Sequence, residues 1–134
     1  MLDFMAIRYD TAHDVKVLAN EIIETLSFYH IIPERVLCVR SRGSRSKRTI
    51  ARIHGLPRIW QEALNTNPYY IIEVISERYD NQTEEEKEKT IIHELLHIPK
   101  GFKGGFRYHK GWITKGRIES LYRILVRKRR LSNY

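Results

Sequence analysis

Apolar residues recur at helical spacing in the first quarter of the chain. They lie three or four residues apart and form one stripe, made by Val15, Leu18, Ile22, Leu26 and Tyr29. Thr11, with Asp14 three residues later, resembles a capping box and predicts the start of this helix. Pro33 predicts where it stops. A helix with a single apolar stripe is expected to pack against one flat surface, such as a sheet.

Three later segments are rich in β-branched and aromatic residues and predict a small sheet. Residues 35–42 and 48–54 read as two strands on either side of a turn at Gly43. Residues 69–75 are nearly continuous in apolar character and predict a third strand that is covered on at least one face. Between the second and third strands, residues 57–64 begin with proline and predict a short helix.

The polar stretch after the third strand contains the clearest helix start in the chain. Thr83 is a favoured N-cap, Glu86 lies three residues later, and the acidic residues around it face the positive end of the helix. The sequence therefore predicts a helix from Glu84 to about Ile98, ended by Pro99. Glycines then predict a loop that can fold back sharply.

A last helix is predicted from about Gly116, and a frayed basic tail from residues 126–134. Helices and strands together predict an α+β fold with an N-terminal helix, a small mixed sheet of about three strands and a C-terminal helix. A chain of 134 residues fits one compact core and is too short for two ordinary domains. We therefore expect residues 1–134 to form a single domain.

The composition indicates the cellular compartment and the chemical class of the partners. Lysine and arginine total 24 against 16 acidic residues, and the net charge of +8 favours anionic partners such as nucleic acid or acidic proteins. The single cysteine, Cys38, cannot form an internal disulfide, which fits a reducing compartment. No segment has the eighteen or so apolar residues of a membrane span. We expect a soluble, cytoplasmic protein with a buried Cys38 and no membrane partner.

The predicted helix after Thr83 contains the sequence His-Glu-Leu-Leu-His. Residues four apart on a helix lie about 40° apart around its axis, so the imidazoles of His93 and His97 can converge on one ion. Glu94 lies beside the pair and can act on a water bound to that ion. Zinc with three protein ligands keeps a fourth position for water, as hydrolysis requires. The alternative is that both histidines merely border the apolar face of the helix.

A third ligand must come from the chain after the helix. His109 is the best candidate, because the glycines that follow Pro99 allow the loop to turn back, and Glu119 on the last helix is the second candidate. Arg107 or Tyr108, next to His109, is a possible stabiliser of the oxyanion that forms on a substrate carbonyl. Both of these side chains can equally belong to the loop surface.

The sequence "HELLHIP", followed by "GFKGGFRYH" and preceded by "RSRGSRSKRTIARIHGLPRIWQEAL", resembles a family of small zincin-like metallopeptidases of archaea and their viruses. More distantly, it is similar to the SprT-like proteases. The resemblance covers the chain from the first helix to His109. It implies a minimal zincin-like domain in which His93, His97 and His109 hold Zn²⁺ and Glu94 is the general base on a zinc-bound water. It also implies that the strand at residues 69–75 borders the cleft, where an extended peptide adds as a further strand.

Two basic clusters keep a second function open. The first cluster lies at a predicted hairpin tip and comprises Arg40, Arg42, Arg45, Lys47 and Arg48, and the second lies near the end of the chain and comprises Arg127, Lys128, Arg129 and Arg130. Both clusters are expected either to contact phosphates or to be solvated surface. The first expectation is a zinc-dependent peptidase acting on a peptide or protein. The alternatives are a basic nucleic-acid-binding protein with a structural or vestigial zinc site, acting on DNA-bound proteins, and a module that captures a partner strand at its sheet edge.

Overall fold

The computed structural model of the protein describes residues 6–107 and 111–132. The strands are β1 (Arg8–Thr11), β2 (Val36–Arg42), β3 (Ala51–Gly55) and β4 (Tyr70–Ile75). The helices are α1 (His13–Thr25), α2 (Arg58–Leu64), α3 (Ser76–Tyr79), α4 (Glu84–Leu96) and α5 (Lys115–Ser132), with a 3₁₀ turn, η2 (Pro33–Arg35), before β2. These elements confirm the α+β class that the sequence predicts.

The sheet contains four strands in the described residues, not about three, and their order is β1-β2-β4-β3. β2 and β4 are parallel, whereas β1 pairs with β2, and β3 with β4, in antiparallel fashion. The prediction that residues 35–42 and 48–54 pair across a turn at Gly43 is wrong, because β4 lies between β2 and β3 in the sheet. β4 is almost entirely buried and takes a central position, while the half-exposed β3 is left at the edge.

β1 is the strand that the sequence did not reveal. All four of its residues are exposed, so they carry no alternation of apolar and polar positions. Thr11, expected to cap the first helix, is instead the last residue of this strand, and the N-cap is Ala12, whose side chain makes no capping hydrogen bond. α1 also ends at Thr25, well before Pro33, and the left-handed backbone of Ser27 (φ 57°) marks the turn that follows it.

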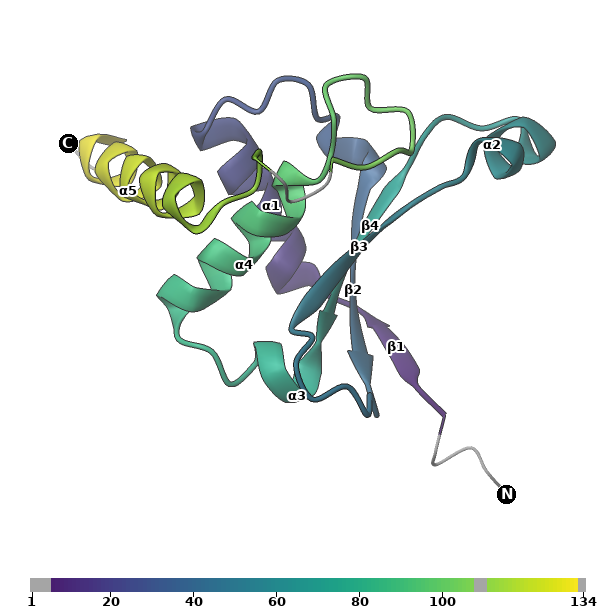
Figure 1. Cartoon of the computed structure of the whole chain (residues 1–134), viewed down its shortest axis with the longest axis horizontal. Helices are drawn as coiled ribbons and strands as arrows, with labels where there is room; N and C mark the ends of the chain where they lie inside the picture. The colour runs from purple at the N-terminus through teal and green to yellow at the C-terminus, as the bar shows by residue number, and fades with distance from the viewer. Residues whose placement is uncertain (1–5, 108–110, 133–134) are drawn as a thin grey trace.

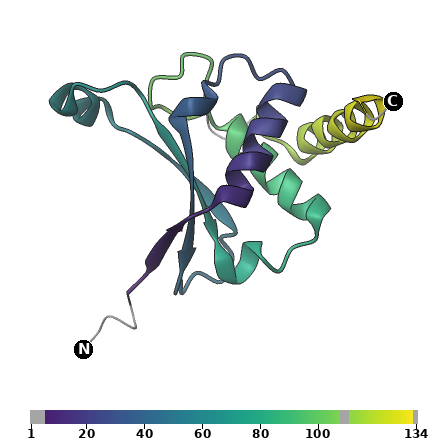
Figure 2. The same ribbon diagram turned by 180° about the vertical axis from the view of Figure 1, so that it is seen from behind.

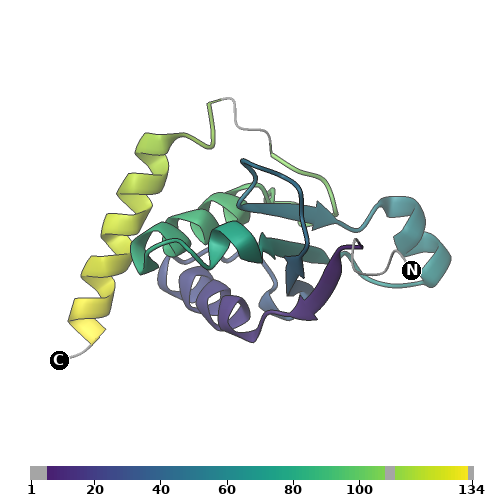
Figure 3. The same cartoon turned by 90° about the horizontal axis from the view of Figure 1, so that it is seen from below.

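Two helices lie on one face of the sheet. α1 packs on β2 and α4 packs on β3, and α5 lies across both helices on their outer side (Figure 1, Figure 2). No described helix covers the opposite face of the sheet. α2 stands away from the core at one end of the molecule, and α5 lies at the other end (Figure 3). The core between sheet and helices includes Val15, Ile22, Val36, Cys38, Tyr70, Ile72, Ile91, Leu95 and Leu125, and the expectation that Cys38 is buried is confirmed.

The last two helices differ in how well the sequence predicts their ends. The capping box of Thr83 and Glu86 is present in full, and α4 stops at Leu96, slightly before the predicted end. α5 does not fray from residue 126 as expected but continues to Ser132. Arg129 in its last turn pairs with Glu21 at 2.6 Å and also with Glu88, and these contacts tie the end of α5 to α1 and α4. No helix in the described residues combines the length and the apolarity of a membrane span.

Candidate active site

The two histidines of the sequence motif lie side by side at the end of α4. Ile91, Ile92 and Leu95 are fully buried against the sheet and α1, and they fix the rotation of the helix. His93 and His97 therefore lie on the neighbouring, half-buried side of the helix. Their ring centroids are 5.2 Å apart and the ring planes are inclined by 50°. The predicted stacking of the two imidazoles on successive turns is confirmed.

The backbone of Arg107 fixes the orientation and the tautomer of His97. The carbonyl oxygen of Arg107 lies 2.7 Å from Nδ1 of His97, and the amide of Arg107 donates to the carbonyl of His97 at 2.7 Å. A carbonyl can only accept a hydrogen bond, so Nδ1 carries a proton, and in the neutral imidazole the lone pair is then on Nε2. Metal-binding histidines characteristically have this arrangement, with the second ring nitrogen bonded to a carbonyl or carboxylate. The residues present fit a metal ion at this place.

The loop after Pro99 returns to α4 by passing very close to the end of β3. A Cβ on Gly55 would lie 2.2 Å from the carbonyl oxygen of Gly104, and Gly104 itself has a positive φ of 102°. Both positions therefore require glycine. The hydroxyl of Tyr70 donates to the carbonyl of Gly105 at 2.7 Å and accepts from the amide of Gly104 at 2.9 Å. The expected sharp return of the loop is confirmed as far as Arg107.

Trp112 makes a second contact between the chain after Pro99 and the end of α4. The indole nitrogen of Trp112 donates to the carbonyl of Leu96 at 3.2 Å. The guanidinium groups of Arg107 and Arg117 each lie 4.0 Å from the centroid of the same indole ring. Residues 107 and 112 are therefore both anchored close to the last turn of α4. Arg107, one of the two candidates for stabilising an oxyanion, is engaged with Trp112 and also borders a cavity beside His97.

Glu94 is a buried carboxylic acid next to the histidine pair. Its exposed fraction is 7%, and burial raises its pKa to about 7. In residues 6–107 and 111–132, no hydrogen bond or ion pair joins its carboxylate to another side chain. A cation held by the two histidines would stabilise the ionised form and oppose this shift. The position suits a group that exchanges a proton with a bound reactant.

A groove runs between the edge strand β3 and α4, with this glutamate at its centre. On one side it forms a cavity of about 610 Å³, and on the other a cavity of about 370 Å³. His93 and Glu94 line both cavities, together with Ala51 of β3. The strand that borders the cleft is thus β3, and the expectation that residues 69–75 border it is wrong. The sequence did not reveal this, because strand order depends on pairing across the sheet.

The candidates for a third metal ligand divide between described and undescribed residues. His109 and Tyr108 lie outside the described residues. Glu119 borders the larger cavity, but its Oε1 lies 2.8 Å from Nζ of Lys89, and this hydrogen-bonded ion pair lowers the pKa of its carboxyl. Within the described part of the chain, no three histidine, cysteine or acidic residues gather as a metal-binding group. Glu119 is therefore held by a lysine instead of joining the histidine pair.

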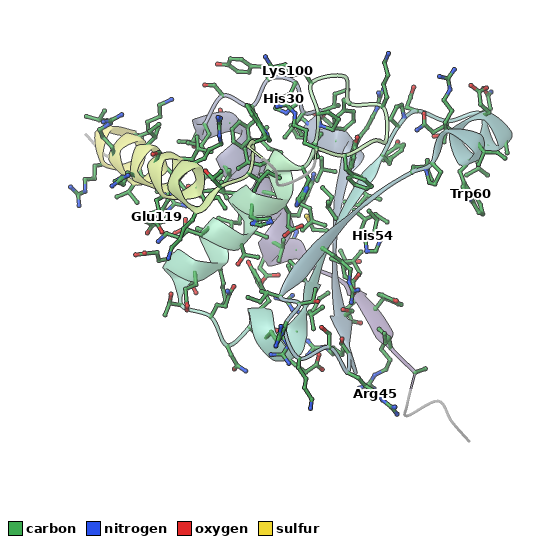
Figure 4. The ribbon with its side chains drawn as sticks, viewed as in Figure 1. His30, Arg45, His54, Trp60, Lys100 and Glu119 are labelled. Carbon is green, nitrogen blue, oxygen red and sulfur yellow. The ribbon has the colours of Figure 1, made fainter. Side chains whose placement is uncertain are left out.

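The two basic clusters do not form one face. Arg45 lies near the end of β1, on the far side of the molecule from Glu119 and α5 (Figure 4). Arg40 is bound by two carboxylates, with its guanidinium 2.9 Å from Asp14 and 2.8 Å from Asp80. In the other cluster, Arg129 is ion-paired and Lys128 donates to the carbonyl of Thr25 at 2.9 Å. Several of these cations thus stabilise contacts within the fold.

The sequence did not identify the residues that wall the groove. Ile113 is only 6% exposed and lines the larger cavity, and Phe106 lines the smaller one. Each lies in a short, glycine-containing stretch that is too brief to show periodicity. In the two hydrogen bonds between Arg107 and His97, Arg107 contributes only backbone atoms, so its residue type does not predict them.

The arrangement places this protein in a recognisable class. A His-Glu-x-x-His sequence on a helix is a zinc-binding motif of metalloproteases, and here this helix borders a groove along the edge strand β3. Residues 7–119 match the model of a protein family described as "Putative phage metallopeptidase", and the chain belongs to this family. The description indicates a metal-dependent peptidase. No curated protein and no solved structure matches the chain.

Proposed function

We propose that the protein is a zinc-dependent peptidase whose reactive centre lies in the middle of the groove between β3 and α4. The observation that carries this proposal is the position of Glu94, a buried carboxyl beside two adjacent imidazoles and between two cavities. A histidine pair with a purely structural role would not require a cavity on each side of Glu94. The family to which the chain belongs supports the same reaction class.

His93, His97 and His109 are the proposed ligands of the ion. In neutral His97, the hydrogen bond from Nδ1 to the carbonyl of Arg107 makes Nε2 the nitrogen that would bind the ion. His109 follows Arg107 by two residues in the sequence, and two chain steps span at most about 7.6 Å between Cα atoms. Arg107 is itself joined to His97 by two hydrogen bonds. An imidazole at position 109 is therefore within reach of the pair, whereas Glu119 is already engaged with Lys89.

A zinc ion bound here would act as a Lewis acid on the substrate carbonyl and would lower the pKa of a bound water to near neutral pH. Glu94 accepts the proton of the attacking water. The same carboxyl then donates this proton to the amine that leaves, so the glutamate returns to its starting state. Its buried position keeps bulk water from competing for the proton, and this is the catalytic role that we assign to it.

The free edge of β3 is the proposed binding surface for the substrate backbone. Among the described strands, β3 pairs only with β4, so its other edge is unpaired. An extended peptide can add there as a fifth strand, with its backbone held by β3 and its reacting carbonyl opposite Glu94. A folded globular substrate cannot enter in this way. The enzyme should therefore act on extended or unfolded segments.

The test is hydrolysis of an unfolded protein mixture by the full chain, before and after removal of metal. The proposal predicts cleavage that stops on chelation and returns when zinc is added. The variant His109→Ala should lose cleavage and stoichiometric zinc, while its matched control Glu119→Ala should keep both. Loss of zinc in the Glu119 variant alone would overturn the ligand assignment. Cleavage that persists without metal would overturn the proposed reaction.

A further inference from the structure

The larger cavity of the groove has a floor made of isoleucines. Ile50 from the segment before β3, Ile113 from the loop before α5 and Ile118 from α5 line it, and we call these three residues the isoleucine pocket. Ile113 is almost completely buried, and the other two pack against the hydrophobic core. The surface of the cavity is mostly apolar. Side chains from three separate segments of the chain therefore converge on one apolar depression beside His93.

Two of the charged residues at the rim of this pocket, Lys89 and Glu119, are paired with each other, and Arg48 and Lys115 also line the cavity. Lys89 lies 2.8 Å from Glu119 and 2.6 Å from Glu85, and its ammonium group lies 5.0 Å from the ring centroid of Tyr122. These contacts neutralise the lysine and Glu119 locally. A charged substrate side chain in the pocket would have to give up water without gaining an unpaired partner from them. An apolar side chain gains from being buried there.

The direction of β3 decides which substrate residue reaches the pocket. The larger cavity touches residues 48–51, ahead of and at the start of β3, and the smaller cavity touches residues 51–53, farther along it. A peptide that adds antiparallel to β3 continues the antiparallel pairing of β3 with β4. Such a peptide runs from the smaller cavity to the larger one. The residue that follows the reacting carbonyl then places its side chain toward the isoleucine pocket.

We propose that the isoleucine pocket selects peptides with a large apolar residue immediately after the bond that is cut. This inference rests on the proposed peptidase function and adds the substrate class to it. The cavity of about 610 Å³ is open to solvent and large enough for a leucine, methionine or phenylalanine side chain. Discrimination by an apolar pocket is modest, about 10- to 200-fold for a change of one methylene. The enzyme should prefer large apolar residues without excluding small ones.

The experiment is cleavage of a diverse peptide library by the zinc-loaded full chain, with cleavage sites identified by mass spectrometry. Leucine, isoleucine, methionine and phenylalanine should be enriched at the position after the cut. The variant Ile118→Trp fills the pocket and should shift this preference to alanine and glycine, by about tenfold or more. The control Ile124→Trp lies on the same helix but does not line the groove, and it should leave the preference unchanged. Thermal melts establish that both variants fold.

Each alternative result has a distinct meaning. Cleavage with no apolar preference, or a preference that Ile118→Trp leaves intact in a folded protein, overturns the pocket assignment while the peptidase function stands. Apolar enrichment on the other side of the cut overturns the antiparallel direction on which the assignment depends. Absence of cleavage by the zinc-loaded protein, for every peptide, overturns the pocket assignment together with the proposed function.

Discussion

Two buried glutamates, one on each side of the sheet, differ in the side chains that contact their carboxylates. Glu94 on α4 is 7% exposed, and Glu73 on β4 is 5% exposed. Burial alone acts on Glu94 and raises its pKa to about 7. Burial also acts on Glu73, but the hydrogen bond with His54 and the charge of Arg52 outweigh it and leave the pKa lowered. His54 lies on the sheet face that carries no helix (Figure 4).

This difference separates a carboxylate that serves the fold from one that is available for chemistry. Oε1 of Glu73 lies 2.8 Å from Nε2 of His54 and 3.2 Å from Nε of Arg52, so its charge is already satisfied within the protein. Glu94 has no such contacts with other described side chains, and one cavity of the groove lies on each side of it. Equal burial therefore does not mean equal function, and the partners of each carboxylate decide the role.

The largest expected effect comes from Glu94→Gln. This change keeps the size of the side chain but removes the proton acceptor, so peptide hydrolysis should fall by about 10²- to 10⁴-fold. The thermal stability of the protein should not decrease, since a neutral amide replaces a carboxyl that burial disfavours in its charged form. Rates of hydrolysis and melting temperatures, measured on the same preparations, check both statements. Full activity in this variant would remove Glu94 from the mechanism.

Glu73→Gln should produce the reverse pattern. The charge-assisted contacts with His54 and Arg52 are lost, and the free energy of unfolding should fall by about 1–2 kcal/mol, because both cations are half-exposed and can regain water. The rate constant kcat of the folded variant should stay near that of the unchanged protein. Urea unfolding and steady-state kinetics measure the two quantities. A large drop in kcat at unchanged stability would show that the two glutamates do not differ in role.

The smallest effect is in the pH dependence of that stability difference. The pKa of Glu73 is lowered in the folded protein from its ordinary value of 4.5, so its ionised form favours folding above that pH. The contribution is lost as the pH falls below 4.5 and through the lowered pKa. The melting temperatures of the unchanged protein and of Glu73→Gln should therefore differ at pH 7 and converge in acid. A difference that grows in acid would reverse the assigned sign.

Local signals in the sequence were sufficient for the helix that bears the site. The capping box at Thr83 and the spacing of His93 and His97 are properties of one short segment, and α4 reproduces both. The α+β class also follows from the alternation of helical and strand patterns along the chain. Such predictions succeed because each interaction joins residues that are close in sequence.

Features that depend on distant pairing were not accessible in this way. β4 lies between β2 and β3 because it is the most buried strand, and this order makes β3 the wall of the groove. Glu73 reads as one polar residue in an apolar strand, and its partner His54 is nineteen residues away. Arg107 contributes only backbone atoms to its two hydrogen bonds with His97. Sequence patterns indicate which face of a helix or strand is buried, but they do not indicate which helices and strands pack against each other.

The central claim is that the histidine pair of α4 holds a metal ion. Titration of metal-free protein with zinc tests it most directly, using the unchanged chain, Glu94→Gln, His93→Ala and His97→Ala. We predict one zinc ion per chain for the first two proteins and loss of this stoichiometric binding in both histidine variants. Undiminished binding of one zinc ion by folded His93→Ala and His97→Ala would contradict the claim.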